Sequence, residues 1–182
     1  HMWSQFVSHD TNSALSLDGL RNSHPIEQAV RDPSEIRELF DAISYSKGGS
    51  ILRMLENFLG PETFRDGLRE YIQRYQYENA RTEHLWGALE EISGQPVMAV
   101  MDSWIKQVGY PVLHVKAERD SNGGMCLDLH QQRFLYDHLN EPSGDSESPI
   151  WRVPVNVVSE IGGAETRVLM SQERLVVPIP DV

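Results

Sequence analysis

Residues 97–118 read VMAVMDSWIKQVGYPVLHVKAE, and within them the spacing of the apolar residues changes at Gly109. Before Gly109 the apolar residues recur every three or four positions, which is typical of a helix. After it they alternate at every second position, which is typical of a strand. The same contrast separates the two halves of the chain. We therefore expect an α+β fold, with an all-α helical subdomain over residues 1–109 and a small antiparallel β-sandwich over residues 110–182.

Helical spacing recurs throughout the first half of the chain. Gly60 followed by Pro61 combines a helix stop with a helix start, and Thr82 is a suitable N-cap for the helix after it. Two prolines within residues 21–33 predict an extended connector, because a proline disfavours helix at the preceding residue. The expected helices are 3–20 with a break near residues 10–12, 34–42, 44–59, 61–75, 83–93 and 96–109, and their short connections predict antiparallel neighbours.

Alternating apolar residues predict short strands in the second half. The first two, at 112–118 and 125–131, flank the hairpin sequence Ser121-Asn122-Gly123-Gly124. Pro154 interrupts the alternating run 151–157 and predicts an edge strand or a bulge there. The remaining expected elements are a polar loop at 136–149 and strands at 166–170 and 175–179.

Composition limits the classes of partner and cofactor. The 182 residues are 40% hydrophobic, which is enough for a core, and 27 acidic against 16 basic residues give a net charge of -11. Such a chain repels phosphate backbones, so we expect no nucleic-acid partner. The single cysteine, Cys126, allows no internal disulfide, no cysteine zinc knuckle and no iron–sulfur site, and we interpret it as a small buried apolar residue. No apolar run approaches the roughly 20 residues that span a bilayer, so we expect no membrane partner. His1 and Met2 resemble an expression scar.

The histidines do not form a metal motif, because none begins a His-Glu-x-x-His sequence. His24 and Glu27 are three residues apart, but Pro25 lies between them. His114 and His130 are expected to face each other across the hairpin as a polar pair on its solvent side. The residues therefore predict no metal ligands in this chain.

One segment is unusual by physical criteria: residues 40–50, FDAISYSKGGS. Adjacent glycines near a helix start cost roughly 1 kcal/mol each relative to alanine. One feature that would compensate for this cost is the close approach of another backbone or a ligand to the glycines, which a side chain at these positions would block. Tyr45 stands just before these glycines. It either packs in the core with its hydroxyl hydrogen-bonded, which is the simpler interpretation, or aims the hydroxyl into a cleft.

Five runs occur in the order in which they are found in a known family. They are LDGLRNSHPI at 17–26, ISYSKGGSILRML at 43–55, TEHLW at 82–86, VMDSW at 100–104 and QVGYPV at 107–112. This pattern resembles the gluzincin zinc aminopeptidases, the group that contains aminopeptidase N and puromycin-sensitive aminopeptidase. The resemblance covers nearly the whole chain. It implies that residues 1–109 are the C-terminal part of a thermolysin-like catalytic domain and that residues 110–182 are a β-sandwich domain, incomplete at its C-terminus.

The resemblance also implies a chemistry. These enzymes remove N-terminal residues from peptides with a zinc ion held by a His-Glu-x-x-His helix and a distant glutamate, and they hold the substrate amine with a Gly-x-Met-Glu-Asn motif. This sequence contains neither motif. The resemblance therefore implies a fragment of a zinc aminopeptidase in which the zinc ligands lie outside this chain, so that the chain alone has no metal or cofactor ligand and is inactive.

One catalytic residue is implied by the resemblance within this chain. The tyrosine of the family's Ser-Tyr-Ser-Lys-Gly motif hydrogen-bonds the oxyanion of the tetrahedral intermediate, and it matches Tyr45. A neutral phenol, with a pKa of about 10, stays protonated and can donate to that oxygen. Lys47 and His24 also match the family, but no role follows for them. Gly49 stands where many relatives have alanine, which leaves the role of Tyr45 intact.

Two other classes of function stay open on the sequence. The parent protein could be a relative that has lost its zinc motif and serves as a non-catalytic scaffold, or the chain could be a free-standing helical protein-interaction module.

We also expect the chain to self-associate through an open sheet edge or an exposed helical face. Pro178 and Pro180 would block strand addition in the monomeric alternative. The location is unknown, with the cytoplasm favoured.

Overall fold

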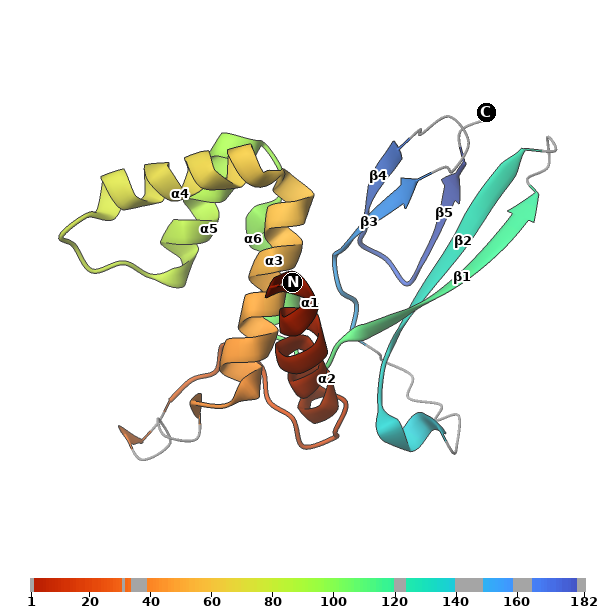
Figure 1. Cartoon of the computed structure of the whole chain (residues 1–182), viewed down its shortest axis with the longest axis horizontal. Helices are drawn as coiled ribbons and strands as arrows, with labels where there is room; N and C mark the ends of the chain where they lie inside the picture. Colours follow the sequence, from red (N-terminus) through yellow and green to blue (C-terminus); the bar gives the residue numbers. More distant parts are fainter. Residues whose placement is uncertain are drawn as a thin grey trace. The chain divides into compact units, whose positions relative to one another are not determined.

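A computed structural model of the chain describes residues 2–30, 32–33, 39–119, 124–139, 149–158 and 165–179. Within these residues the α-helices precede Gly109 and the strands follow it (Figure 1), so the predicted α+β fold is confirmed. The chain forms two compact units. A helical unit comprises His1–Asp18 and Asn22–Val108, and a β unit comprises Gly109–Val182 together with Gly19–Arg21.

The first helix is continuous at the place where the sequence predicts a break. Helix α1 (Met2–Phe6) passes through a π-helical turn, Val7–Thr11, into α2 (Asn12–Asp18). The Asn12 N–H donates to the carbonyl of Val7, five residues earlier, which is the bond that defines a π turn. The expected break is therefore a local widening of the helix and not an interruption.

The other helices agree closely with the expected ranges. A second π-helical turn, Ile43–Lys47, leads into α3 (Gly48–Leu59), and α4 (Pro61–Tyr75) follows directly. Gly60, between α3 and α4, has a φ of 85°, which favours glycine. Helices α5 (Thr82–Ser93) and α6 (Val97–Ile105) complete the unit. Most of the helix expected at 34–42 lies outside the described residues.

The predicted N-cap of α5 is wrong by one position. The N-cap is Arg81, which is extended with φ of −116° and ψ of 164°, and Thr82 is already helical. The cause is His84, whose Nδ1 accepts the Arg81 N–H at 3.3 Å and so satisfies the backbone group at the start of the helix. A histidine in this capping position was not part of the pattern that identified Thr82.

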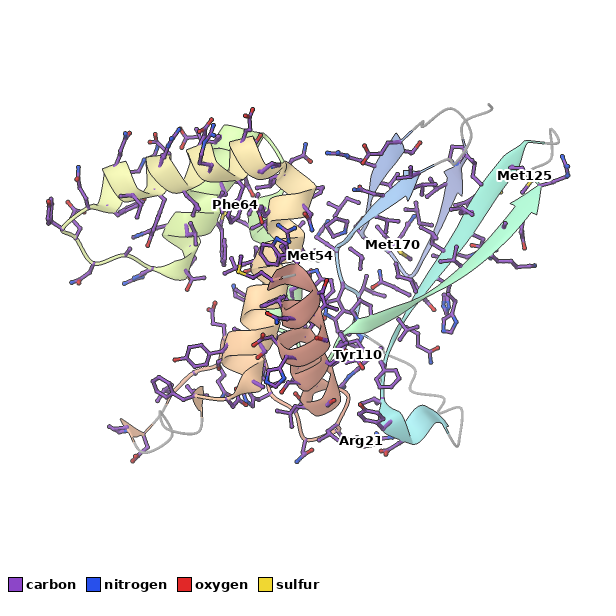
Figure 2. The ribbon with its side chains drawn as sticks, in the orientation of Figure 1. Arg21, Met54, Phe64, Tyr110, Met125 and Met170 are labelled. Carbon is purple, nitrogen blue, oxygen red and sulfur yellow. The ribbon has the colours of Figure 1, made fainter. Side chains whose placement is uncertain are left out.

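Three helices contribute the core of the helical unit. Its buried members are Ile51 and Leu55 of α3, Trp86 and Leu89 of α5, and Val97, Met101 and Ile105 of α6. Met54 and Phe64, labelled in Figure 2, pack against this core from α3 and α4. Helix α4 packs along α5 (Figure 1), and it carries a buried glycine, Gly67, at this contact. No helix in the described part of the chain is long and apolar enough to cross a membrane.

The β unit contains two antiparallel sheets. Strands β1 (Pro111–Arg119), β2 (Met125–Arg133) and β5 (Arg174–Pro178) form one sheet in the order β1-β2-β5, and β3 (Val153–Val158) pairs with β4 (Glu165–Met170) in the other. Leu129, Met170 and Val177 are the buried centre of the core that the sheets share, and Figure 2 shows Met170 between them. Most of the expected loop at 136–149 lies outside the described residues.

Several expectations for single residues of the β unit are confirmed. His114 lies opposite His130 across the β1–β2 ladder, and their ring centroids are 6.1 Å apart. Pro154 lies in β3, which pairs only with β4 among the described strands and is thus an edge strand there. Cys126 is buried, with 7% of its surface exposed.

A buried glutamine, which the sequence did not single out, connects the two sheets. The Gln131 side chain is 2% exposed and bonds the backbone of Trp151 twice. Its Oε1 accepts the Trp151 N–H at 2.9 Å, and its Nε2 donates to the Trp151 carbonyl at 3.0 Å. Nε2 also donates to the carbonyl of Gln172 at 2.9 Å. The amide thus satisfies backbone groups in the segment before β3 and in the turn before β5.

The contact between α4 and α5 gives a matched pair of glycine variants as a test. A Cβ at Gly67 would lie 2.6 Å from Leu89 Cδ2 and 3.2 Å from Leu89 Cα, whereas a Cβ at Gly87 would meet nothing within 4 Å. Such crowding costs about 1–3 kcal/mol, and alanine in an open helical position gains about 0.5–1 kcal/mol. We therefore expect urea unfolding to show that Gly67→Ala lowers the free energy of unfolding and that Gly87→Ala raises it. Equal stabilities would contradict the close contact.

Candidate functional site

Tyr45 is the centre of the candidate site, and it lies on the π-helical turn Ile43–Lys47, called the tyrosine turn below. Its side chain is 64% exposed, and its ring lies 6.1 Å from that of Phe40. Its hydroxyl has no hydrogen-bond partner among the described residues. The simpler interpretation, a core tyrosine with a bonded hydroxyl, is therefore wrong for this chain.

A hollow of about 490 Å³ lies beside Tyr45, called the Tyr45 hollow below. Residues of the connector, the tyrosine turn, the start of α3, α5 and α6 line it. Its lining residues are Ile26, Glu27, Ser44, Tyr45, Gly48, Gly49, Ile51, Leu52, Thr82, Leu85, Trp86, Met101 and Ile105. An exposed phenol thus stands at the edge of a mainly apolar hollow.

The two adjacent glycines have different surroundings. A Cβ at Gly49 would lie 3.4 Å from the Phe6 ring of α1, an ordinary van der Waals distance, so this contact does not require glycine. A Cβ at Gly48 would meet nothing within 4 Å. Gly48 therefore leaves space open at the hollow, and nothing else in the described residues requires glycine there.

A buried ion pair holds the tyrosine turn from inside. Lys47 Nζ lies 2.8 Å from Asp18 Oδ2, and the two side chains are only 6% and 2% exposed. Lys47 also donates to the carbonyl of Gln107 at 3.4 Å, and the Ser23 hydroxyl donates to Asp18 Oδ1 at 2.8 Å. The last residue of the turn is thereby joined to the end of α2 and to the residues after α6.

A second pair holds the tyrosine turn at its first residues. His24 Nε2 lies 2.8 Å from Asp41 Oδ2, and His24 Nδ1 lies 2.9 Å from the carbonyl of Pro25. Asp41 Oδ1 accepts the Ser44 N–H at 2.9 Å, and the Asp41 carbonyl accepts the Tyr45 N–H at 3.1 Å. The connector is therefore joined through Asp41 to the backbone of Tyr45 itself.

The two members of this second pair shift each other's pKa. Burial alone would lower the pKa of His24, but the bonds to the Pro25 carbonyl and to Asp41 outweigh burial and raise it above 6.5. Burial alone would raise the pKa of Asp41, but the Ser44 N–H and His24 outweigh burial and lower it below 3.8. The stabilisation from His24 is therefore fully present below pH 6.5 and is lost as the pH rises through its raised pKa. That from Asp41 is present above pH 3.8 and is lost as the pH falls through its lowered pKa.

Hydroxyl groups connect the tyrosine turn with the π turn of the first helix. Ser50 Oγ donates to the Ser46 carbonyl at 2.8 Å and lies 3.0 Å from Thr11 Oγ1. Because the single Ser50 proton is used on Ser46, Thr11 is the donor to Ser50. The π turn of the first helix is thus linked through the Ser50 side chain of α3 to the Ser46 carbonyl of the tyrosine turn.

The family resemblance implied a role for Tyr45 and none for the groups that hold it. For Lys47 a signal was present in the spacing, because Ile43, Lys47, Ile51 and Leu55 are four residues apart and all are buried. A lone cation in a buried stripe requires a buried anion. Asp18 follows the buried Ala14 by the same spacing and was the matching candidate.

The described residues offer no metal site. They bring together no group of three or more His, Cys, Asp and Glu side chains that could hold a metal ion. The residues of this chain described by the structure therefore do not fit the zinc ion that the resemblance implies, and no step of the chemistry below is assigned to such an ion.

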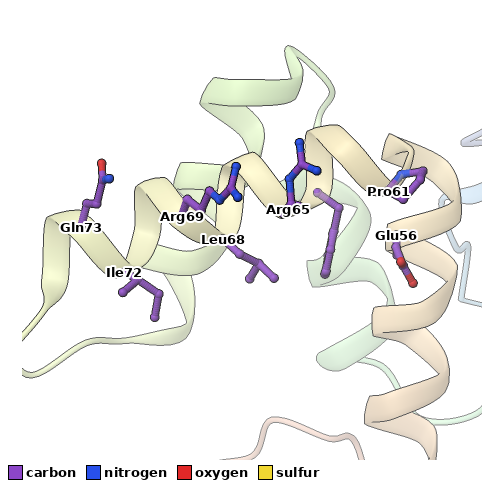
Figure 3. Close-up of a pocket in the computed structure, with 8 residues that line it drawn as sticks. Glu56, Pro61, Arg65, Leu68, Arg69, Ile72 and Gln73 are labelled. Carbon is purple, nitrogen blue, oxygen red and sulfur yellow. The ribbon is translucent and has the colours of Figure 1, made fainter.

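A second hollow, of about 620 Å³, lies along α4. Figure 3 shows Leu68 and Ile72 on one side of this helix, with Pro61 and Glu56 where α3 gives way to α4. Its polar members are exposed side chains such as Arg65 and Arg69, and Ile72 is 61% exposed. This surface lacks the buried polar contacts that surround the tyrosine turn.

Comparisons with known proteins agree on one family. The model of the peptidase family M1 domain matches residues 1–104. Aminopeptidase M1-D of Oryza sativa subsp. japonica is 43% identical over 173 residues, which is 95% of this chain and 18% of that protein. Aminopeptidase 2, mitochondrial, of Saccharomyces cerevisiae is 41% identical over 99% of this chain and 18% of its own length. Puromycin-sensitive aminopeptidase of Caenorhabditis elegans is 39% identical over 95% of this chain and 18% of its own length.

These matches identify the chain first as part of a peptidase and then as a member of one peptidase family. The helical unit has the sequence of a peptidase domain, since the family model covers more than half of the chain. The chain belongs to peptidase family M1, as the resemblance implied. It spans less than a quarter of the length of the curated relatives, between 16% and 20%.

The buried ion pair yields a stability prediction. Removing one partner of a buried pair leaves an unpaired buried charge and costs about 3–5 kcal/mol. We expect Lys47→Met and Asp18→Asn each to lower the free energy of unfolding by that order, and the double variant to recover much of the loss, as urea unfolding would measure. Lys106→Met removes an exposed pair with Asp102 and serves as the control, with little expected change. Additive losses in the double variant would contradict a direct pairing.

Proposed function

We propose that this chain is part of a zinc-dependent aminopeptidase that removes N-terminal residues from peptides. The support is the family membership, the aminopeptidase names of the relatives and the small share of their length that the chain spans. In this proposal residues 1–109 are the C-terminal part of a thermolysin-like catalytic domain, and residues 110–182 are an incomplete β-sandwich domain. The zinc ligands then lie in parts of the enzyme outside this chain.

Tyr45 is the residue of this chain that we place in the reaction. Attack on a peptide carbonyl puts negative charge on its oxygen, and a positioned donor stabilises that charge. The phenol of Tyr45 carries an O–H group that can act as such a donor. The observation that carries the proposal is its exposure of 64% beside the Tyr45 hollow, on a turn that is held by buried polar contacts.

The alternatives are a non-catalytic scaffold and a helical interaction module. Neither requires the Tyr45 hydroxyl to be free or the tyrosine turn to be held at both of its ends. A variant that removes only this hydroxyl therefore separates catalysis from the other two functions.

The decisive variant is Tyr45→Phe in the full-length enzyme. Loss of one oxyanion donor lowers kcat on the order of 10²–10³-fold, about 3–4 kcal/mol. Because the bond forms chiefly in the transition state, we expect KM to change much less. Hydrolysis of alanine and leucine anilides at several substrate concentrations would measure both constants.

Tyr77→Phe is the matched control, because Tyr77 lies after α4 in the same unit and is fully exposed. We expect it to retain the activity of the unmodified enzyme. If Tyr45→Phe also retains more than half of that activity, Tyr45 has no part in the mechanism.

The isolated 182-residue chain should show neither zinc binding nor hydrolysis. The reason is that neither the His-Glu-x-x-His motif nor the amine-binding motif occurs in its sequence. Calorimetric titration with zinc and an anilide assay of the same sample would test this. Stoichiometric zinc binding at submicromolar affinity together with hydrolysis would show that the chain carries a complete site.

Two further expectations stay predictions. Self-association of the chain would use the unpaired edges of its short sheets, and Pro178 at the end of β5 opposes strand addition on one of them. A cytoplasmic location is favoured by the sequence alone.

A further inference from the structure

The two polar contacts of His24 favour the charged form of its ring. Its Nδ1 lies 2.9 Å from the Pro25 carbonyl oxygen, and its Nε2 lies 2.8 Å from Asp41 Oδ2. A carbonyl and a carboxylate oxygen only accept, and a neutral imidazole has a single N–H to offer. Both contacts are hydrogen bonds only when the ring is the doubly protonated imidazolium.

Asp41 transmits this charge to the backbone that carries Tyr45. One carboxylate oxygen faces His24, and the other accepts the Ser44 N–H at 2.9 Å. The Asp41 carbonyl accepts the Tyr45 N–H at 3.1 Å. When His24 loses a proton, the neutral ring can donate to only one of its two acceptors, so it is no longer held between the Pro25 carbonyl and Asp41, and Asp41 loses its charged partner.

Two acidic groups of the helical unit act on His24. Asp41 raises its pKa through the hydrogen bond and the charge, and Asp18 raises it through the charge alone. Lys47 lies 2.8 Å from Asp18 and opposes the effect of Asp18. The net direction is upward, so His24 stays charged to a higher pH than a free histidine.

We propose that His24 is a positioning residue for Tyr45: as an imidazolium between the Pro25 carbonyl and Asp41, it orients the tyrosine turn for donation by the phenol. This inference rests on the proposed function, since it concerns the same donor. His24 touches no reacting atom and acts only through Asp41 and the backbone of the turn.

The first experiment uses the 182-residue chain and needs no activity. NMR titration from about pH 5 to 9 should show a His24 pKa above 6.5 that falls in Asp41→Asn. The ring resonances of Tyr45 should move with the titration of His24. They should lose this transition in His24→Gln and keep it in the control His114→Gln, whose histidine lies on β1 in the other unit. A Tyr45 ring that does not follow His24 would overturn the inference.

The second experiment uses the full-length enzyme and the ratio of wild-type kcat to that of His24→Gln. Glutamine is uncharged at every pH, so we expect a ratio of about 10 below the pKa of His24, falling to about 1 above it. The ratio cancels titrations that both enzymes share. His114→Gln should give a ratio near 1 throughout.

A double-variant cycle separates positioning from general damage to the fold. If His24 acts through the Tyr45 hydroxyl, His24→Gln causes no further loss of kcat in a Tyr45→Phe background. A loss that is independent of pH, or one that adds fully to that of Tyr45→Phe, would overturn the inference. Failure of the proposed function is a different result, namely full activity of Tyr45→Phe alone, and the NMR coupling can then still be read in the chain.

Discussion

The helical unit depends on one buried ion pair, Asp18 with Lys47. Two opposite charges that are 2% and 6% exposed cannot be left unpaired, because the cost of an isolated buried charge is several kcal/mol. The end of α2 and the end of the tyrosine turn must therefore meet in one register. Such a pair is weak support for net stability, since apolar side chains of similar size could replace it. Its effect is to exclude every arrangement in which the two charges do not meet.

The widened geometry of the tyrosine turn becomes understandable from this constraint. Ile43, Ile51 and Leu55 lie on the same buried face as Lys47. The position of this face is set by the packing of the apolar side chains, and the Lys47 ammonium is held by Asp18. Residues four positions apart share one face of a helix, and a residue two positions from both of its buried neighbours lies on the opposite face. Tyr45, within this turn, is left 64% exposed between two buried residues of the stripe. The exposure of the phenol is thus a consequence of how its neighbours are held.

Much of the secondary structure was predictable, because helix and strand periods are local properties of the sequence. The boundary of α4 at Pro61 follows from a stop and a start signal that need no tertiary information. The N-cap at Arg81 did not follow, since it depends on a side-chain bond from His84 that competes with the better propensity of Thr82. The π turn at Val7–Thr11 was noticed only as an irregularity, because a period of 3.6 residues has no place for it.

The candidate site was predictable to a different extent. The catalytic role of Tyr45 was predicted from the family motif. Without the motif, the sequence around Tyr45 favoured a position in the core, which the exposure of its side chain contradicts. The two ion pairs that hold the tyrosine turn join residues far apart in the sequence. His24 and Asp41 are separated by 17 positions, and Asp18 and Lys47 by more. Pairings over such distances are set by the packing of α2, the connector and α3, and a local pattern does not contain them.

The four charged groups around the tyrosine turn also balance one another. Lys47 is paired with Asp18, and His24 is paired with Asp41, whose charge it neutralises when the ring is protonated. In the proposed reaction, in which the Tyr45 phenol donates to a developing negative charge, an unpaired carboxylate nearby would oppose that charge. At the start of the turn the Asp41 carboxylate accepts the Ser44 N–H. A carboxylate close to Tyr45 therefore needs a cation beside it. His24 supplies that cation when protonated, and its hydrogen bond to Asp41 also orients the carboxylate.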